Sequence, residues 1–129
     1  MIERQEGFSY TEILVSMAVI TVGVLGFSLN TISVIQGNRN SASHTIATNL
    51  AQDKLEQLGA QPALSNIDRC SGSGERGISA SGAAGGIYDR CWTIKDSSLG
   101  SGLKEISVTV HWRDSGLRAV TLSTLVFTE

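Results

Sequence analysis

The sequence lacks charged side chains over a long stretch near its start, because no Asp, Glu, Lys or Arg occurs in residues 13–38. A helix in the core of a soluble protein would carry a polar face over such a length. Residues 13–35 are instead dominated by apolar residues, and they supply about the twenty residues that a helix needs to cross a bilayer. The stretch therefore predicts a membrane-spanning helix, in which Ser and Thr hydroxyls can bond back to the backbone.

An excess of basic residues is also missing. The chain of 129 residues has 10 Lys and Arg against 12 Asp and Glu, its formal net charge is -2, and its basic residues are scattered. Because a polyanion-binding surface needs clustered positive charge, we expect no nucleic acid among the partners. The length allows one domain at most.

Known catalytic patterns are absent from the sequence, which has no nucleophile elbow, phosphate loop, metal-ligand cluster or pair of catalytic carboxylates. The stretch GSGERG is rich in glycine but lacks the Lys of a phosphate loop. His44 and His111 are interpreted as surface or sheet-face residues and not as ligands. We therefore expect no enzyme activity, no cofactor and no metal.

The first residues differ from an ordinary secretory signal, which has a basic front, a shorter apolar region and a small-residue cleavage site. Here Glu3, Arg4 and Glu6 precede the apolar run, and that run extends well past signal length. Directly before it stand Gly7 and then the residues Phe-Ser-Tyr-Thr-Glu, which end at Glu12. The order of these residues needs another explanation.

The arrangement of Gly7, Phe8 and Glu12 before an apolar run resembles the class III signal of type IV pilins and pseudopilins. The resemblance implies cleavage between Gly7 and Phe8 by a membrane-embedded prepilin peptidase, followed by N-methylation of Phe8. The span survives this processing because the scissile bond precedes it. The chain departs from the family pattern in its poorly basic leader. It also carries Ser-Tyr-Thr before the Glu, where the family usually has Thr-Leu-Ile or similar.

Glu12 has two compatible interpretations. Ser9 and Glu12 match the Ser-x-x-Glu capping box at the start of a helix. The resemblance implies a role in subunit assembly, in which the Glu12 carboxylate pairs with the free amine of Phe8 on a neighbouring subunit. Since an unpaired charge near lipid costs several kcal/mol, such pairing would remove a penalty. We favour the assembly role.

The residues after the span predict a continued helix with one apolar face, formed at three- and four-residue steps by Ile46, Ala47, Leu50, Ala51, Leu55 and Leu58. Gly59 and Pro62, the only proline, provide a stop signal, so one helix is predicted from about Ser9 to Leu58. Alternation predicts strands over 87–95, 105–113 and 117–127.

The fold class predicted from these elements is α+β, with a long N-terminal helix packed on a small three-stranded antiparallel sheet. The helix is apolar in its first half and amphipathic in its second, and pilins have the same architecture. The Gly-rich stretch between Pro62 and the first strand is interpreted as an irregular connection. Trp92 and Trp112 are expected in the core.

Cys70 and Cys91 are the only cysteines. The resemblance implies a head outside the cytoplasm, where an oxidising environment favours a disulfide. Such a bridge would close a loop of about twenty residues and stabilise the head by roughly 3 kcal/mol. A metal pair is the other interpretation, although two cysteines without nearby ligands at finger spacing make a poor zinc site.

The expected organisation is a leader over 1–7, a transmembrane or filament-core helix over 8–35 and a globular head over 36–129. The chain looks most like a minor pilin of the pilus modification (PilV-like) group, which joins or primes a type IV pilus. Before assembly it would lie in the bacterial inner membrane with its head in the periplasm, and afterwards in the pilus or at the cell surface.

The resemblance also implies partners. These are the prepilin peptidase and N-methyltransferase, the major pilin, other minor pilins, the inner-membrane assembly platform, and membrane lipid before assembly. Two other functions stay open. One is an I-type pseudopilin of type II secretion, and the other, from a different class, is a single-pass membrane-anchored sensing or binding domain.

Overall fold

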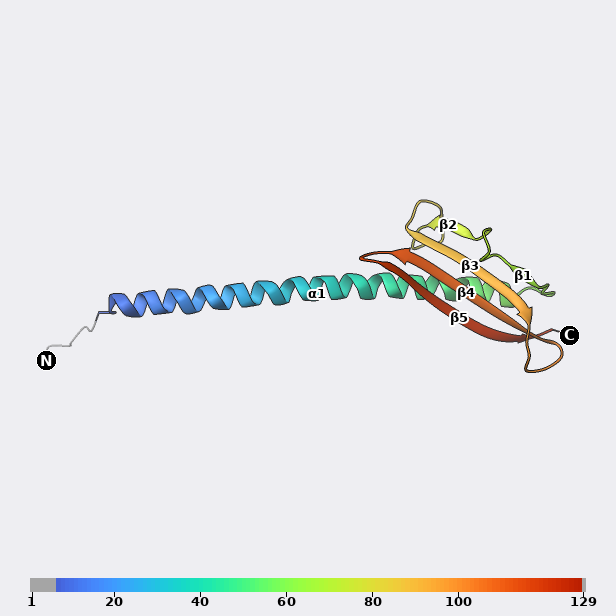
Figure 1. Ribbon diagram of the computed structural model, residues 1–129, viewed down its shortest axis with the longest axis horizontal. Helices are drawn as coiled ribbons and strands as arrows, with labels where there is room; N and C mark the ends of the chain where they lie inside the picture. Colours follow the sequence, from blue (N-terminus) through green and yellow to red (C-terminus); the bar gives the residue numbers. More distant parts are fainter. Residues whose placement is uncertain (1–6, 129) are drawn as a thin grey trace. The chain divides into compact units, whose positions relative to one another are not determined.

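The computed structural model describes residues 7–128 and shows one long helix followed by five strands (Figure 1). Helix α1 runs without interruption over Tyr10–Gly59, which is 50 residues. The predicted helix from about Ser9 to Leu58 therefore matches within one residue at each end. The chain divides into two compact units, one up to Arg39 and the other from Asn40 onward. Each unit is described by itself.

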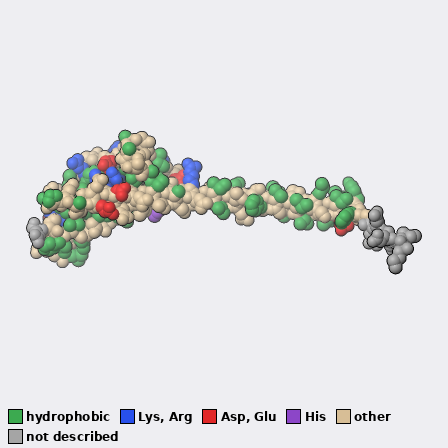
Figure 2. Space-filling model, turned by 180° about the vertical axis from the view of Figure 1, so that it is seen from behind, with side chains coloured by type: hydrophobic (Ala, Val, Ile, Leu, Met, Phe, Trp, Pro, Cys, Tyr) green, Lys and Arg blue, Asp and Glu red, His purple; other side chains and the backbone are tan. Residues whose placement is uncertain are grey.

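The first unit consists of the helical segment 10–39, in which every residue is exposed. Its polar groups are largely satisfied within the helix, since the hydroxyls of five residues donate to the carbonyl oxygen four positions earlier: Ser16, Thr21, Ser28, Thr31 and Ser33. The remaining surface is mostly hydrophobic (Figure 2). This helix is long and apolar enough to cross a membrane.

The second unit contains the end of α1 and an antiparallel sheet. The strands are β1 (Ile67–Asp68), β2 (Glu75–Ile78), β3 (Tyr88–Asp96), β4 (Leu103–Arg113) and β5 (Leu117–Phe127). Their order in the sheet is β1-β3-β4-β5, and β2 also pairs with β3. The long strands β3, β4 and β5 run side by side over one face of the helix (Figure 1). The α+β fold is thus as predicted.

The prediction of a three-stranded sheet is wrong, because the structure has five strands. Both extra strands lie in the stretch that was interpreted as an irregular connection. Strand β1 has 2 residues and β2 has 4, and the pairing of β2 with β3 shifts register between Glu75 and Ile78. Gly77, inside β2, has a φ of 62°. Neither strand has an alternating pattern of its own, so their pairing with β3 defines them.

The core lies between the second half of α1 and the inner face of the sheet. The helix contributes Ala47, Leu50, Ala51 and Leu58, and the sheet contributes mainly Tyr88, Ile94, Ile106, Val108, Val110 and Trp112. Trp112 is buried as expected, whereas Trp92 is half-buried and packs against the edge of the core. On the opposite face of the sheet, hydroxyl pairs join β4 to β5, with Thr109 and Thr121 at 2.9 Å and Ser107 and Ser123 at 2.7 Å.

Candidate functional site at the helix start and in the head

The residues of the N-terminal motif lie at the very start of α1. Gly7, Phe8 and Ser9 precede the helix, which begins at Tyr10. The side chain of Phe8 is 80% exposed. The Gly7–Phe8 peptide bond therefore lies just before the helix and outside it. The rest of the expected leader, residues 1–6, lies outside the described residues.

The first turn of α1 does not form the side-chain capping box. The Ser9 carbonyl oxygen accepts the backbone N–H groups of Glu12, at 2.9 Å, and Ile13, at 3.2 Å. The Ser9 hydroxyl bonds to the Thr11 hydroxyl at 2.8 Å instead of capping a backbone N–H. Within residues 7–128 the exposed Glu12 carboxylate has no ion-pair partner. It is therefore available to a cation on another molecule.

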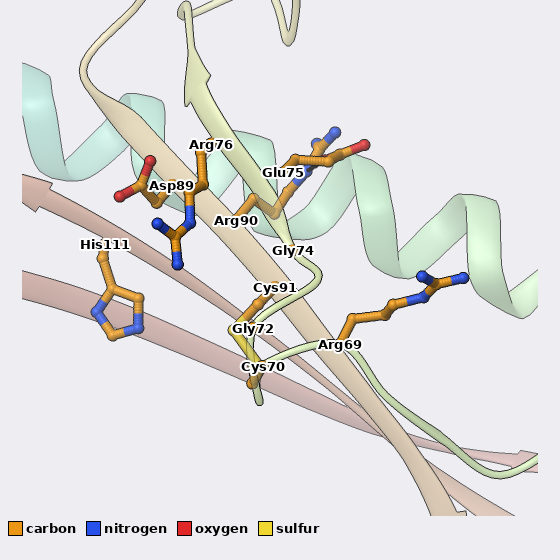
Figure 3. A pocket seen from close by; sticks show the side chains of 10 residues that line it. All are labelled: Arg69, Cys70, Gly72, Gly74, Glu75, Arg76, Asp89, Arg90, Cys91 and His111. Carbon is orange, nitrogen blue, oxygen red and sulfur yellow. Dashed lines mark hydrogen bonds and ion pairs between the residues drawn. A yellow bond between two sulfur atoms is a disulfide. The ribbon is translucent and has the colours of Figure 1, made fainter.

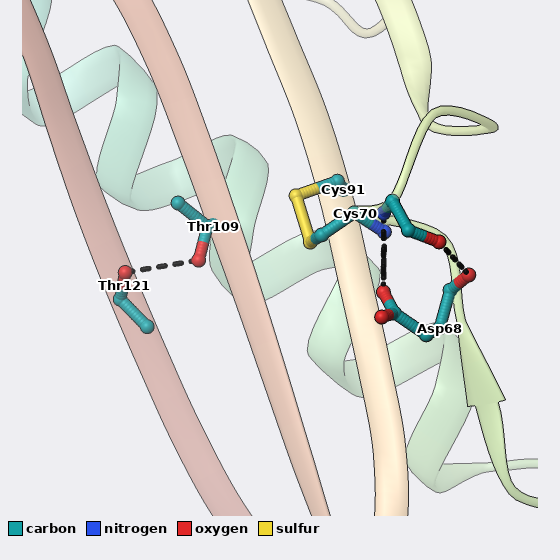
Figure 4. Close-up of a disulfide and its surroundings, with 6 residues drawn as sticks. Asp68, Cys70, Cys91, Thr109 and Thr121 are labelled. Atoms are coloured by element: carbon teal, nitrogen blue, oxygen red, sulfur yellow. Dashed lines mark hydrogen bonds between the residues drawn. A yellow bond between two sulfur atoms is a disulfide. The ribbon is translucent and has the colours of Figure 1, made fainter.

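The two cysteines form a disulfide that ties the loop after β1 to strand β3 (Figure 4). The Asp68 side chain orders this loop, since its Oδ1 accepts the backbone N–H groups of Cys70 at 2.9 Å and Ser71 at 3.2 Å. No cysteine in the described part of the chain is free. The metal-pair interpretation is therefore not needed for these two residues.

The chain approaches β3 closely beside the disulfide, at Gly74. A Cβ atom at this position would lie 2.9 Å from the Arg90 carbonyl oxygen and 2.9 Å from the Cys91 Cβ. Both contacts are too short for a side chain, so glycine is required here. The disulfide and this close contact together fix β2 against β3.

An ion-pair network links β2 to the helix. Arg90 Nε donates to Glu75 Oε2 at 2.6 Å, and Arg90 Nη1 donates to the Leu50 carbonyl oxygen at 3.0 Å. Lys54 Nζ lies 3.4 Å from Glu75 Oε1 and 3.9 Å from the centre of the Trp92 ring. The Arg90 side chain is only 7% exposed. A guanidinium buried to this extent needs such partners, because an unpaired buried charge is costly.

The pKa of Glu75 reflects this network. Burial of the carboxyl is the largest single influence and raises its pKa, but Arg90 and Lys54 together outweigh it. The net result is a pKa below the ordinary value of 4.5. The sequence signal for this network was Arg90 itself, a charged residue in the apolar row of a predicted strand.

A polar depression of about 160 Å³ adjoins the disulfide (Figure 3). Its charged side chains are partly engaged, because Asp89 Oδ1 accepts the Gly77 N–H at 2.9 Å and Arg90 pairs with Glu75. Arg76 and His111 also line it. Among the described residues no group of three or more His, Cys, Asp or Glu could hold a metal ion. The lining offers no nucleophile paired with a base, and we assign no reaction to it.

A second depression, of about 440 Å³, lies where the helix faces the β4–β5 hairpin. It is lined by Asn40, Ser41, His44, Thr45, Trp112 and Arg118. The His44 ring meets the Trp112 ring edge-on, with 6.0 Å between centroids. The Trp112 Nε1–H is buried and has no acceptor among the described residues. This site was missed from the sequence, because only the pairing of Trp112 with Arg118 across β4 and β5 brings its parts together.

Comparison with known proteins gives no match, since no family model, no curated protein and no solved structure is similar to the chain. Function is therefore inferred from the chain's own residues. The motif of Gly7, Phe8 and Glu12 belongs to the first unit, and the disulfide of Cys70 and Cys91 belongs to the second.

Proposed function

We propose that the protein is a type IV pilin-like subunit, a minor pilin that joins or primes a type IV pilus. The observation that carries the proposal is the order of Gly7, Phe8 and Glu12 directly before a continuous helix whose residues 10–39 are all exposed. Cleavage after Gly7 would leave this helix intact and create a new amine at Phe8. The fold of the head, a helix on an antiparallel sheet, supports the same assignment.

The exposed apolar helix suggests how such a subunit would pass from the membrane into a filament. A surface of this size cannot remain in water, so it needs lipid or other apolar helices as its surroundings. In the proposed function it lies in the inner membrane before assembly, with the head in the periplasm. During assembly it moves into a bundle of like helices from the major pilin and other minor pilins. Apolar contact is retained throughout, and the inner-membrane platform drives the transfer.

Glu12 is the group that changes partner during this transfer. Its carboxylate has no cationic partner among the described residues, and a charge at the edge of the membrane is costly unless it is paired. The amine of a processed Phe8 on a neighbouring subunit is a cation of the right kind. Pairing would therefore favour the filament over the membrane-dissolved subunit and would set the axial position of each subunit.

Mass spectrometry of the chain purified from its native membranes tests processing. We expect a mature chain that begins with N-methylated Phe8. Gly7→Val is the matched variant, because a Cβ at Gly7 meets nothing within 4 Å and the substitution leaves the fold intact. It should abolish cleavage. A wild-type chain that retains Met1 would contradict the proposal and favour a single-pass anchored sensing or binding domain.

Glu12→Gln tests assembly, because it keeps the size of the side chain and removes its charge. We expect the variant to insert, to be processed and to fold its head, but to be lost from the sheared filament fraction. Ser9→Ala is the control, since within residues 7–128 the Ser9 hydroxyl hydrogen-bonds only to the Thr11 hydroxyl. Equal amounts of the Gln variant and wild type in the filaments would rule out the charge-pairing role.

Deletion of the gene for this protein tests whether the protein serves a type IV pilus or a type II secretion system. A minor pilin is required for normal numbers of surface pili, whereas an I-type pseudopilin is required for export of folded proteins by type II secretion. Loss of pili with unchanged secretion is the expected result. Loss of secretion with unchanged pili would move the assignment to the pseudopilin.

A further inference from the structure

We propose that the outer edge of strand β5 binds an extended segment of another protein, which joins the sheet as one more antiparallel strand. We call this edge, formed by residues 117–127, the open edge. All the residues that carry the inference belong to the second unit. The inference goes beyond the pilin assignment and does not depend on it.

The open edge presents backbone groups that have no partner in the sheet. Strand β5 has 11 residues and pairs with β4 in an unbroken register from Leu117 to Phe127. It stands last in the strand order, so no described strand pairs with its other side (Figure 1). In an antiparallel sheet, every second residue of such a strand directs its N–H and C=O away from its neighbour. These groups form a template for one further strand.

The two edges of the sheet differ in their protection against such pairing. The edge at β3 is covered by the short strands β1 and β2, by a register shift and by the disulfide of Cys70 and Cys91. The open edge has no such cover, and residues 117–127 contain no proline, no glycine and a single charge, at Arg118. A long edge of this composition pairs readily with another extended chain. The open edge is therefore the part of the sheet best suited to strand addition.

The core side of β5 indicates which side chains the added strand carries. Val120 and Leu122 pack against the core but stay half-buried. Their direct partners on β4, Val110 and Val108, are fully buried. Val126 is half-buried in the same way. Because an apolar side chain on the next strand would cover each of these three residues, we expect apolar residues at alternate positions of the partner.

The outer side of the sheet adds a specific contact near the end of β5. A depression of about 510 Å³ lies between the loop after β3 and this end of β5, and its lining includes Leu99 and Leu125. These two side chains are 75% and 45% exposed. Glu105, which also lines the depression, already pairs with Lys95 at 3.3 Å. A large apolar residue opposite Leu125 on the added strand would therefore contact both leucines.

The charge of Arg118 distinguishes a different chain from a second copy of this one. Arg118 is exposed, and none of the ion pairs among residues 7–128 includes it. An acidic residue opposite Arg118 would therefore meet a free cation. Pairing of two β5 strands around Leu122 would instead place Arg118 opposite Val126, and pairing around Arg118 would oppose two like charges. We therefore infer a different chain, in which an acid follows the residue opposite Leu125 by seven positions.

The test uses the full chain in dodecyl maltoside micelles and a synthetic peptide with this pattern, acetyl-Ser-Val-Leu-Val-Thr-Val-Thr-Val-Ser-Glu-Ser-amide. Antiparallel pairing from Phe127 back to Leu117 places the Leu of the peptide opposite Leu125 and its Glu opposite Arg118. Fluorescence anisotropy of the labelled peptide should show saturable binding. Amide hydrogen exchange, followed by nuclear magnetic resonance, should slow at every second residue of β5. Unchanged exchange along β5 would overturn the proposal.

Two N-methylated forms of the peptide test pairing through the backbone. One form carries N-methyl groups at odd-numbered positions and the other at even-numbered positions, so their side chains are identical. Only one of them blocks the N–H groups that face β5. We expect that form to bind about tenfold or more weakly, because it loses several hydrogen bonds, and the other to bind like the unmodified peptide. Equal affinities of the two forms would overturn the proposal.

A matched pair of leucine variants tests the contact at the depression. Leu125→Ala should weaken binding of the peptide about fivefold, because the Leu of the peptide loses apolar contact. Leu117→Ala removes the same atoms from the other end of β5, outside the depression, and should change the affinity by less than about twofold. Equal losses in the two variants would contradict the proposed pairing.

A charge exchange tests the register. Arg118→Glu should weaken binding about fivefold, because two acids then face each other, and a peptide with Lys in place of its Glu should regain the lost affinity. Failure of the Lys peptide to do so would overturn the pairing. Slow exchange at the same amides that increases with the concentration of the chain, without any peptide, would show that a second copy occupies the open edge. That result would overturn the assignment to another protein.

Discussion

Helix α1 meets two different environments along its length. Large apolar side chains of its first part, such as Leu25 at 61% and Phe27 at 73%, are exposed. In its second part Leu50 is 1% exposed, and Ala47 and Ala51 are fully buried against the sheet. The backbone is the same continuous helix in both parts. The two parts differ in whether the chain itself supplies a partner.

The residue types in the two parts reflect this difference. Where the helix packs on its own sheet, alanine at the contact lets the helix approach closely and larger residues fill the space beside it. In residues 10–39 apolar residues occur all around the helix, which is typical of a segment surrounded by lipid or by other helices. The second part therefore stabilises the head, whereas residues 10–39 stay exposed along their whole length.

Matched Leu→Ala substitutions provide the strongest test of this difference. Leu50→Ala leaves a cavity in the core, and we expect it to lower the free energy of unfolding of the head by about 2–5 kcal/mol. Leu25→Ala removes the same atoms from an exposed position and should change it by less than about 0.5 kcal/mol. Urea unfolding of the full chain in micelles, followed by tryptophan fluorescence, measures both. Similar losses in the two variants would show that the two parts are not independent.

Reduction of the disulfide should destabilise the head and leave the helical segment 10–39 unaffected, which is the second largest effect expected. Loss of the bond between Cys70 and Cys91 frees a loop with a sequence separation of 21, and we expect the head to lose about 3 kcal/mol. The double variant Cys70→Ser/Cys91→Ser gives the same comparison without a reductant. Circular dichroism should show the helical segment 10–39 unchanged while the head unfolds at lower urea. An unchanged urea midpoint for the head would show that the bond contributes nothing to its stability.

Gly→Ala substitutions should change stability in opposite directions in the two parts, lowering it in the head and raising it in the helical segment 10–39. Gly74→Ala places a Cβ 2.9 Å from both the Arg90 carbonyl oxygen and the Cys91 Cβ, so we expect a loss of about 1–3 kcal/mol in the head. Gly23→Ala meets nothing within 4 Å and should stabilise the helix by up to about 1 kcal/mol. Thermal unfolding followed by circular dichroism and fluorescence distinguishes them. A stabilised head in the Gly74 variant would contradict the close packing at this position.

The sequence predicts the long elements well because each carries a repeated pattern. Strand β4 shows unbroken alternation, so it was predicted to begin at 105 and end at 113 and is found over Leu103–Arg113. Strands β1 and β2 were not predicted, because they have only 2 and 4 residues and a segment of that length is too short to show an alternating pattern. Their conformation depends on β3, the disulfide and the contact at Gly74, which are tertiary features.

The candidate sites were predictable to different degrees. The N-terminal motif is contiguous in sequence, so Gly7, Phe8 and Glu12 could be named from the sequence and their roles stay predictions. The depression between the helix and the β4–β5 hairpin joins residues 40–45 to Trp112 and Arg118, and the sequence offers no pattern that relates them. The burial of the Trp112 indole beside this depression depends on three-dimensional packing.

The smallest expected effect concerns the carboxylates of the two parts. Glu75 pairs with Arg90 and Lys54 in the head, whereas Glu12 has no ion-pair partner within the described residues. Glu75→Gln keeps a hydrogen-bond acceptor for Arg90, so at pH 7 we expect a loss of only about 1 kcal/mol. Glu12→Gln should leave the unfolding of the head unchanged, and unfolding in urea measures both.

The pH dependence of the Glu75 variant follows from the direction of its pKa shift. In the folded head the pKa of Glu75 is lowered from 4.5, because Arg90 and Lys54 together outweigh the opposing effect of burial. The unfolded chain therefore binds this proton at higher pH than the folded head does. The stabilisation by Glu75 is fully present above about pH 4.5 and is lost as the pH falls through the lower folded pKa. The difference in unfolding free energy between wild type and Glu75→Gln should thus shrink below that pH. A difference that stays constant from pH 7 to pH 3 would mean that the ionised carboxylate contributes nothing through its charge.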